Sequence, residues 1–521
     1  MSSSILLLFF TFILSLFSLS LSQPQIPRSF RINCGAPSPI DFNGHQWLPD
    51  SNFISAGENK TVPYSWVLPI LSSVRSFAQE RNAQKKFCYE IGPVIISARY
   101  MVRTTYFYGG VNGVRHEKPP VFDQIVDGTL WGLVNTTEDY AHNMSTYYEG
   151  VFQAARKTMS ICLGVNKLTD SDPFISAIEM VMLDASIYNS TKFSQNALSL
   201  ISRNNFGFTG PILRSPDDQF DRLWQPFGPH QAATLVPNVS VSGFWNLPPA
   251  EIFETRLAVD SGQMELQWPA GHLPSSTYYI ALYFADDSNS SSGRSFDISI
   301  NDVPYIRNIS VTSSGVAVFA TQWPLVGLTR IKFTPADESG AGPLINGGEI
   351  FNVLTVGKRT LLRDVILLKS IKRRLLNPPH DWNGDPCFPT GYSWTGISCS
   401  NGTRVRIISI NLMNMGLSGS LSPDIANLTA LNTIVLRNNS LSGFIPSMLG
   451  KLNHLEILSL EDNQFIGPIP SSLADVTSLR KLHLENNNLS GTVPKSLLEK
   501  PDLDFTFTPG NSLSLPAGQN T

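Results

Sequence analysis

The chain has 521 residues, of which 42% are hydrophobic and 15% are charged, and its formal net charge at pH 7 is −3. The length predicts several domains, and the hydrophobic fraction is sufficient for well-packed cores. A chain so close to neutral offers no electrostatic basis for binding nucleic acid or an anionic membrane surface. The short basic run Lys372-Arg373-Arg374 does not change that conclusion, and we interpret it as a solvated helix end.

Residues 1–22 have the pattern of a secretory signal peptide. Ile5 to Leu21 is almost wholly apolar, and Ser20 and Ser22 place small side chains just before a cut at Gln23. No Lys or Arg precedes the apolar run, so an uncleaved anchor helix stays as the alternative. The pattern predicts export from the cytoplasm.

Acceptor motifs for N-glycosylation, Asn-x-Ser/Thr, recur along the whole chain. They begin at Asn59, Asn135, Asn143, Asn189, Asn238, Asn289, Asn308, Asn401, Asn427, Asn438 and Asn488. Their spread predicts an exported glycoprotein, although a composition rich in Asn and Ser is the alternative explanation. We therefore expect a secreted protein on the cell-wall side, or a cell-surface protein if the sequence is a fragment or splice form of a membrane-anchored one.

The 5 cysteines should mostly pair in an exported protein. Cys387 and Cys399 are close in sequence, and a disulfide between them would contribute about 2–3 kcal/mol. For the rest we predict a Cys88–Cys162 disulfide and a buried, free Cys34, while the sequence leaves other pairings open. No paired Cys-x-x-Cys or cluster of His accompanies them, so we expect neither a metal nor another cofactor.

The region before residue 358 contains a faint internal duplication. Ile96 to Tyr106 alternates in polarity as a strand does, and Tyr278 to Phe284 is a similar strand downstream. A Phe-Asp pair follows each strand, and each half then closes with Pro, two apolar residues, three spacers and a Glu. The closing Glu residues are Glu179 and Glu349.

This duplication predicts two tandem β-sandwiches, because short alternating strands with Gly and Pro punctuation are typical of that fold. The predicted sandwiches cover residues 23–202 and 225–357. A segment rich in Asn, Asp, Gly and Pro, residues 203–224, is the predicted linker between them.

Residues 358–400 are predicted to connect the sandwiches to the C-terminal region of the chain. Apolar residues return at helical spacing from Thr360 to Leu376, with Thr360 as N-cap and Asn377-Pro378-Pro379 as the stop. The segment from Asp381 to Cys399, with two Trp and the expected disulfide, is predicted to cover the end of a solenoid.

Four copies of one leucine-rich pattern fill residues 401–508. The anchors lie 24 residues apart, at Ile407, Leu431, Leu455, Leu479 and Leu503. Such a period predicts an α/β solenoid whose stacked copies bury the leucines jointly, so the fold class is mostly β with a C-terminal solenoid. A recurring Asn, as in Asn463, is expected to satisfy backbone groups where the chain turns. Residues 509–521 are expected to form a flexible tail.

Several of these segments resemble the ectodomains of plant malectin-like/leucine-rich-repeat receptors. The resemblance to malectin-like domains rests on Ile32-Asn33-Cys34-Gly35-Ala36 with Trp47, the strand around Arg99 to Gly109, the Phe-Asp pairs and Phe174 to Glu179. The segment from Trp382 to Cys387 resembles the cap before plant leucine-rich repeats.

The resemblance covers nearly all of the mature chain and implies two malectin-like sandwiches with a cleft between or along them. It implies recognition, since malectin binds a diglucose through aromatic rings and an aspartate, whereas plant relatives often recognise peptides or act with partner receptors. Receptors of this family continue into a membrane helix and many into a kinase. No second long apolar run comes after residue 21 here, so the sequence as written predicts a soluble mature chain.

Aromatic residues at strand ends, with nearby aspartates, form the candidate carbohydrate site. Its members are Tyr106, Phe107, Tyr108, Asp123, Tyr283, Phe284 and Asp286. The rings would stack on sugars, and Tyr283-Phe284 matches the Tyr-Phe pair of malectin. The alternative is that the rings fill the sandwich cores, although strand alternation predicts one exposed ring in each pair.

Outward positions on the repeat strands form a candidate surface for another protein, with a plain solvated face as the alternative. They are Thr433, Val435, Ile457, Ser459, Lys481 and His483. No catalytic motif is present, so we expect no enzyme. The sequence predicts an extracellular recognition protein that binds cell-wall carbohydrate. The alternative is a module for a small secreted peptide or a co-receptor, with a membrane receptor kinase as a candidate partner.

Overall fold

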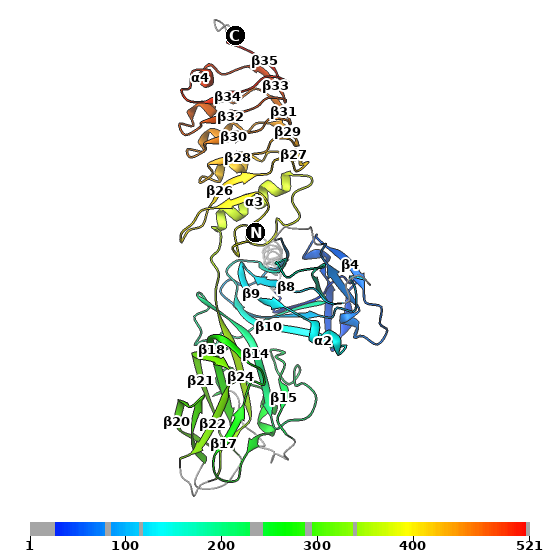
Figure 1. The fold of residues 1–521 in the computed structure, drawn as a ribbon, viewed down its shortest axis with the longest axis vertical. Helices are drawn as coiled ribbons and strands as arrows, with labels where there is room; N and C mark the ends of the chain where they lie inside the picture. The colour runs from blue at the N-terminus through cyan, green and yellow to red at the C-terminus, as the bar shows by residue number, and fades with distance from the viewer. Residues whose placement is uncertain are drawn as a thin grey trace, which may run out of the picture.

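A computed structural model describes residues 27–78, 85–113, 118–229, 243–286, 294–336 and 341–516. The predicted signal peptide and the acceptors Asn238 and Asn289 lie outside these residues. Three parts follow one another along the long axis of the molecule, and the first β lobe lies between the second β lobe and the repeats (Figure 1). The chain therefore returns along the first lobe after the second. There Val356 N donates to Gln195 O at 2.8 Å and Gly357 N donates to Thr129 Oγ1 at 3.0 Å.

One long sheet runs through both lobes. Its strands are, in spatial order, β2 (Ile40–Phe42), β3 (His45–Pro49), β1 (Ser29–Asn33), β13 (Ala177–Met182), β7 (Arg99–Tyr106), β10 (Thr146–Gln153), β14 (Asn196–Phe206), β24 (Gly347–Thr355), β18 (Leu273–Phe284) and β21 (Val316–Gly327), with β15 (Gln225–Phe227) paired to β14. The predicted β-sandwiches are confirmed, but they share this sheet.

Smaller sheets and short helices complete each lobe. The first lobe adds the sheet β6 (Lys86–Ile91), β11 (Met159–Gly164), β8 (Phe122–Val126) and β9 (Thr129–Val134), the sheet β12 (Phe174–Ile175), β5 (Ser73–Ser76) and β4 (Glu58–Thr61), and the helices η1 (Asp50–Asn52), η2 (Pro69–Leu71) and α2 (Thr137–Ala141). The second lobe adds the sheet β17 (Met264–Gln267), β22 (Arg330–Pro335), β19 (Arg294–Ile300) and β20 (Val303–Val311), the pair β16 (Leu257–Ala258) and β23 (Leu344–Ile345), and the helix η4 (Ala250–Glu254).

The predicted linker over residues 203–224 is wrong at its start. β14 continues to Phe206 and pairs antiparallel with β10 of the first lobe and with β24 of the second. The remainder contains buried side chains, among them Asp218, Arg222 and Trp224. The polar composition that suggested a loop thus belongs to a packed segment whose charges are paired.

Helix α3 (Leu362–Arg374) confirms the predicted helix, a little shorter at both ends. The predicted N-cap is wrong, because Leu361 occupies that position and the Thr360 hydroxyl donates to Asp385 instead. Val365, Leu368 and Ile371 form the buried face of the helix, and the last two join the hydrophobic core of the repeats.

The repeats confirm the predicted solenoid. One parallel sheet contains β26 (Ile407–Asn411), β28 (Thr433–Val435), β30 (Ile457–Ser459), β32 (Lys481–His483) and β34 (Asp504–Thr506), with β25 (Ile397–Cys399) antiparallel at its start. A second sheet contains β27 (Ser418–Ser420), β29 (Ser440–Phe444), β31 (Gln464–Gly467), β33 (Asn488–Thr492) and β35 (Ser512–Ser514). The connecting helices are η5 (Pro423–Asn427), η6 (Ser447–Lys451), η7 (Ser471–Asp475) and α4 (Lys495–Leu498).

The recurring Asn side chains satisfy the backbone between neighbouring coils, as predicted. Asn463 donates through Nδ2 to Leu436 O at 2.9 Å and accepts at Oδ1 from Leu441 N at 3.0 Å. Asn511 repeats this arrangement and accepts from Leu489 N at 2.8 Å. The predicted flexible tail is therefore wrong for residues 509–516, where a further coil stacks on the array.

None of the described helices is long and apolar enough to span a membrane.

A candidate ligand groove between the first lobe and the repeats

The aromatic residues predicted to bind carbohydrate are buried, so the predicted site is wrong. Tyr106 and Tyr283 are each 0% exposed, and Phe107, Tyr108 and Phe284 are also core residues. Tyr283 packs in a cluster that spans both lobes and Phe284 in a cluster of the second lobe, on opposite faces of β18. Alternation places one ring on each face, as expected, but both faces of the sheet are covered.

The two aspartates of the predicted site are also bonded to other side chains of the protein. Asp286 accepts from Arg256 at 2.7 Å and from Arg294 at 2.6 Å. Asp123 accepts from Asn166 at 2.8 Å and from the Tyr392 hydroxyl at 2.7 Å. The second contact joins the first lobe to the cap of the repeats.

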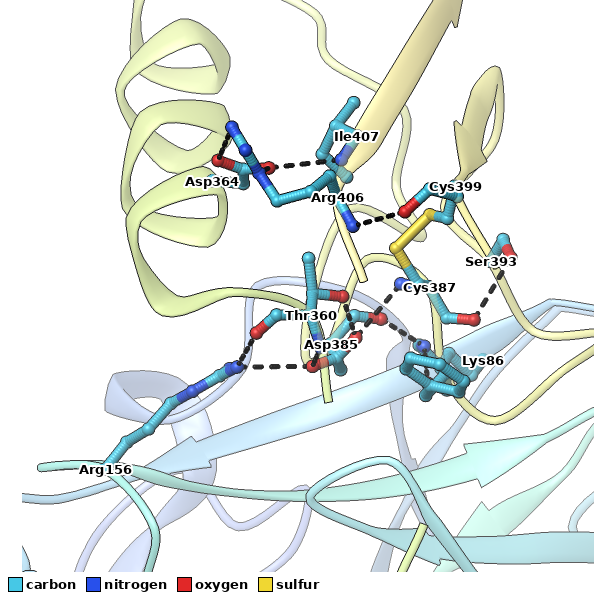
Figure 2. Close-up of a disulfide and its surroundings, with 12 residues drawn as sticks. Lys86, Arg156, Thr360, Asp364, Asp385, Cys387, Ser393, Cys399, Arg406 and Ile407 are labelled. Atoms are coloured by element: carbon cyan, nitrogen blue, oxygen red, sulfur yellow. Dashed lines mark hydrogen bonds and ion pairs between the residues drawn. A yellow bond between two sulfur atoms is a disulfide. The ribbon is translucent and has the colours of Figure 1, made fainter. Parts of the chain in front are cut away.

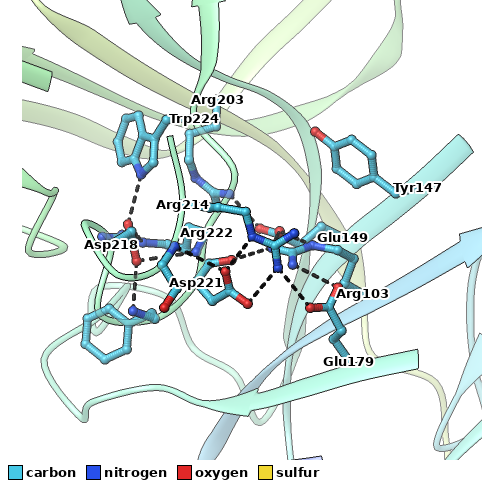
Figure 3. Close-up of polar contacts among 12 residues, drawn as sticks. Arg103, Tyr147, Glu149, Glu179, Arg203, Arg214, Asp218, Asp221, Arg222 and Trp224 are labelled. Carbon is cyan, nitrogen blue, oxygen red and sulfur yellow. Dashed lines mark hydrogen bonds and ion pairs between the residues drawn. The ribbon is translucent and has the colours of Figure 1, made fainter. Parts of the chain in front are cut away.

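A ladder of buried charges crosses the shared sheet (Figure 3). Arg103 donates to Glu179 at 3.0 Å and to Glu149 at 2.8 Å, and Arg203 donates to Glu149 at 2.7 Å and to Glu349 at 2.6 Å. These residues lie on successive strands β13, β7, β10, β14 and β24. Burial alone would raise the pKa of Glu149, but the guanidinium groups of Arg203 and Arg103 outweigh it and hold that pKa below its usual range.

The charged ladder joins the lobes and offers no opening to a ligand. One sequence feature indicated part of this ladder: Glu179 and Glu349 are the Glu residues that close the two duplicated segments. The arginines between them carry no such repeat, so their pairing could not be deduced.

Hydrogen bonds and an ion pair hold the cap of the repeats against the first lobe (Figure 2). Lys86 Nζ donates to the carbonyl oxygens of Asp385 and Phe388, and Arg156 donates to the Asp385 carboxylate at 3.3 Å. Burial lowers the pKa of Lys86 to about 8. The Cys387–Cys399 disulfide closes the cap beside these contacts, as predicted.

The predicted Cys88–Cys162 disulfide is also present, between β6 and β11, and Cys34 is buried and free.

A groove of about 440 Å³ opens where α3 meets the first lobe. Leu362 and Ile366 of α3 form one wall and are 48% and 58% exposed, while Ile96, 51% exposed, contributes to the other wall. The buried face of α3 is turned to the repeats, so these two apolar side chains remain outside the core.

The loop that carries Ile96 is held in place by backbone hydrogen bonds. Val94 N donates to Lys157 O at 2.9 Å and Ser97 N donates to Ala154 O at 2.8 Å. The alternation of polarity predicted a strand from Ile96 to Tyr106, but strand β7 begins at Arg99. The sequence feature that could have indicated the groove is the pair Leu362 and Ile366. Both residues are apolar, yet they lie off the helix face that packs on the core.

Asp127 lines the same groove and has an unused acceptor. Its Oδ1 accepts from Ser160 N at 2.8 Å, whereas its Oδ2 is buried and has no hydrogen-bond partner among the described residues. Burial raises the pKa of this carboxyl group. A buried acceptor without a donor is costly.

A second cleft, of about 420 Å³, lies where the two lobes meet, in the place that the resemblance implied. Two of its charged side chains, Arg99 and Asp184, are already engaged. Arg99 donates to the carbonyl oxygens of Ala185 and Ile187, and Asp184 accepts from Ser186 N at 2.8 Å.

The predicted interaction strip on the repeats is only partly available. Thr433, Val435, Ile457, Lys481 and His483 are half-buried on the parallel sheet. Ser459 is buried and donates to Glu461 at 2.6 Å, so its place in the strip is wrong.

The predicted glycosylation acceptors that the structure describes are all exposed. These are Asn59, Asn135, Asn143, Asn189, Asn308, Asn401, Asn427, Asn438 and Asn488. None of them lines the groove beside α3. Within the described part of the chain, no group of three or more His, Cys, Asp or Glu side chains is arranged to hold a metal ion.

Two joined β-sandwiches are followed by a capped leucine-rich solenoid. The family model for the malectin-like domain matches residues 32–353, and the leucine-rich repeat model matches residues 429–489. The chain belongs to the malectin-like domain family and is a plant malectin-like/leucine-rich-repeat receptor-like protein.

Similar proteins are receptor kinases of Arabidopsis thaliana. The leucine-rich repeat receptor-like serine/threonine-protein kinase At2g14510 is 30% identical over 440 residues, which cover 79% of this chain and 48% of the relative. The probable LRR receptor-like protein kinase At1g51890 is 28% identical and is covered to 49%. The chain thus spans about half the length of these relatives.

Among solved structures, the ANX2 ectodomain of Arabidopsis thaliana has a TM-score of 0.51 at 16% identity. The match covers 62% of this chain and 96% of that one. At this identity the likeness establishes the fold of the two lobes alone.

Proposed function

We propose that the protein is an extracellular, non-catalytic recognition module that binds a polypeptide ligand in the groove between α3 and the first lobe. The observation that carries this proposal is the open apolar cleft walled by Ile96, Leu362 and Ile366. Exposed apolar side chains gathered in one concave site are typical of ligand-binding surfaces. Export is supported by the exposed acceptor sites and by the two disulfides.

The chemistry of the groove favours a polypeptide over a carbohydrate. Sugars present many hydroxyl groups and stack on open aromatic rings, but none of the described residues that line this groove is aromatic. A peptide can bury an apolar side chain between Ile96 and Ile366. This choice favours the peptide-binding alternative that the sequence left open over cell-wall glycan.

A second protein would use the sheet of the repeats. Thr433, Ile457 and Lys481 stand in register on the neighbouring strands β28, β30 and β32. The resemblance to receptor kinases makes a membrane receptor of that kind the partner to test at this surface.

The proposal is tested by panning the full secreted protein against a display library of short random peptides. Enriched peptides should bind the variant Ile366→Asp roughly tenfold or more weakly, because a carboxylate in the cleft desolvates at a cost. Val326→Asp is the matched control, since Val326 is 64% exposed on β21 in the second lobe.

The proposal is wrong if enriched peptides bind both variants equally well. It is also wrong if no peptide is enriched while an array of cell-wall oligosaccharides gives a signal that Ile366→Asp abolishes. Circular dichroism and thermal midpoints of both variants establish that they are folded.

A further inference from the structure

We infer that the ligand of this groove is an acidic polypeptide segment, whose apolar side chain enters the cleft while flanking carboxylates meet a basic rim. The inference rests on the proposed function and specifies the ligand class for the same site. It is carried by the distribution of charge around the groove, which differs in sign from that of the whole chain.

One face of α3 combines the apolar wall with cations. Leu362, Ile366, Lys369 and Arg373 follow one another at the spacing that places residues on one side of a helix. Lys369 lines the groove, and Arg373 lies one turn beyond it and is exposed. A ligand that lies along the helix therefore passes from an apolar to a positively charged surface.

The first lobe adds a cation on the opposite wall. Lys157 lines the groove and is exposed, and in the described part of the chain neither Lys157 nor Arg373 forms an ion pair. The attraction of a helix C-terminus for cations accounts for Arg373 within α3. It does not account for Lys157, which belongs to a separate lobe and faces the same groove.

The neighbouring acidic groups are already neutralised or buried. Glu90 accepts from Lys369 at 2.7 Å and from Gly384 N at 3.0 Å. Asp364 is buried and accepts from Arg406 at 2.7 Å, and Asp385 is buried in the cap. The exposed charge around the groove is therefore positive, which favours an acidic partner and its faster association.

Asp127 does not reverse this preference. Its Oδ2 is buried, so it presents little negative charge at the surface that a ligand meets. The rim, in contrast, is open to water and can meet several carboxylates.

The test uses the same display library with a charge-reversed variant of the full chain. Peptides enriched on the wild type should be rich in Asp and Glu and should bind Lys157→Glu/Arg373→Glu roughly tenfold more weakly. Their affinity for the wild type should fall as salt is raised. The variant itself should enrich peptides that are rich in Lys and Arg.

Arg437→Glu/Lys451→Glu is the matched control, because both side chains are exposed on the repeats. The inference is overturned if the enriched peptides are neutral or basic, or if both double variants bind acidic peptides as the wild type does. In those cases, sensitivity to Ile366→Asp would still uphold the groove as a peptide site. Loss of that sensitivity would overturn both proposals.

Discussion

Arg203 and Glu349 form a fully buried ion pair, with 2.6 Å between Nε and Oε1, on the paired strands β14 and β24. Arg203 also donates to Glu149 of the first lobe at 2.7 Å. One guanidinium group thus bridges a carboxylate from each lobe. The relative placement of the lobes depends on this contact, because charges buried this deeply must be paired.

Replacing Arg203 with Met should lower the free energy of unfolding by about 3–5 kcal/mol, since two buried carboxylates would each lose a cation. Urea unfolding followed by tryptophan fluorescence measures the change. The control is Arg330→Met, whose partner Glu265 is exposed and whose loss should cost less than about 1 kcal/mol. Equal losses for the two variants would contradict a structural role for the charged ladder.

The free energy of unfolding should decrease at acid pH, because Asp221 becomes protonated. Burial raises the pKa of Asp221, but the hydrogen bond from Arg214 and the charges of Arg103 and Arg214 outweigh burial and lower it to about 2. The unfolded chain therefore takes up this proton first as the pH falls. The contribution of Asp221, about 2–3 kcal/mol, is present above about pH 4 and is lost toward about pH 2.

The measurement compares the pH dependence of unfolding for the wild type and Asp221→Asn. The variant should be less stable near neutral pH, and its curve should approach that of the wild type at about pH 2. Asp504→Asn, at an exposed carboxylate, should follow the wild type throughout. A constant difference between the wild type and Asp221→Asn over this range would contradict the assignment.

Features with a local cause were predictable from the sequence. The solenoid period, helix α3 and the Cys387–Cys399 disulfide each depend on residues that are close in the chain. The same holds for the Asn side chains, because each one bonds within its own coil or the adjacent ones.

The candidate site was not predictable in the same way. Strand alternation indicates which face Tyr283 and Phe284 occupy, but not that both faces of β18 are covered. The shared sheet pairs Arg203 with Glu349 across a long stretch of chain, and no periodicity links them. The groove likewise requires Ile96 and Ile366 to meet, which only the docking of the repeats on the first lobe brings about.

Asn463 should be essential to the repeats. The change Asn463→Ala leaves Leu441 N–H without its side-chain acceptor and takes from Leu436 C=O one of its two side-chain donors, the other being Asn439. An unmet buried donor costs about 1–3 kcal/mol. The solenoid should therefore unfold at a clearly lower urea concentration. Asn453→Ala is the control, because Asn453 is exposed between coils and should change stability by less than about 0.5 kcal/mol.

Asp385 should hold the groove in shape by fixing the repeats to the first lobe. Its carboxylate accepts from Thr360 N at 3.0 Å, Cys387 N at 3.0 Å and Arg156 at 3.3 Å, and from the Thr360 hydroxyl. Asp385→Ala removes all four contacts and should cost about 3–5 kcal/mol at the junction, because it leaves buried donors and a cation unpaired. Hydrogen exchange should rise in residues 360–366 and 386–388 but not in residues 431–497, whose packing lies within the coils. Peptide binding to Asp385→Ala should also weaken. The control Asp504→Ala should leave both hydrogen exchange and peptide binding unchanged. Unaltered exchange at the junction in Asp385→Ala would show that this carboxylate does not position the groove.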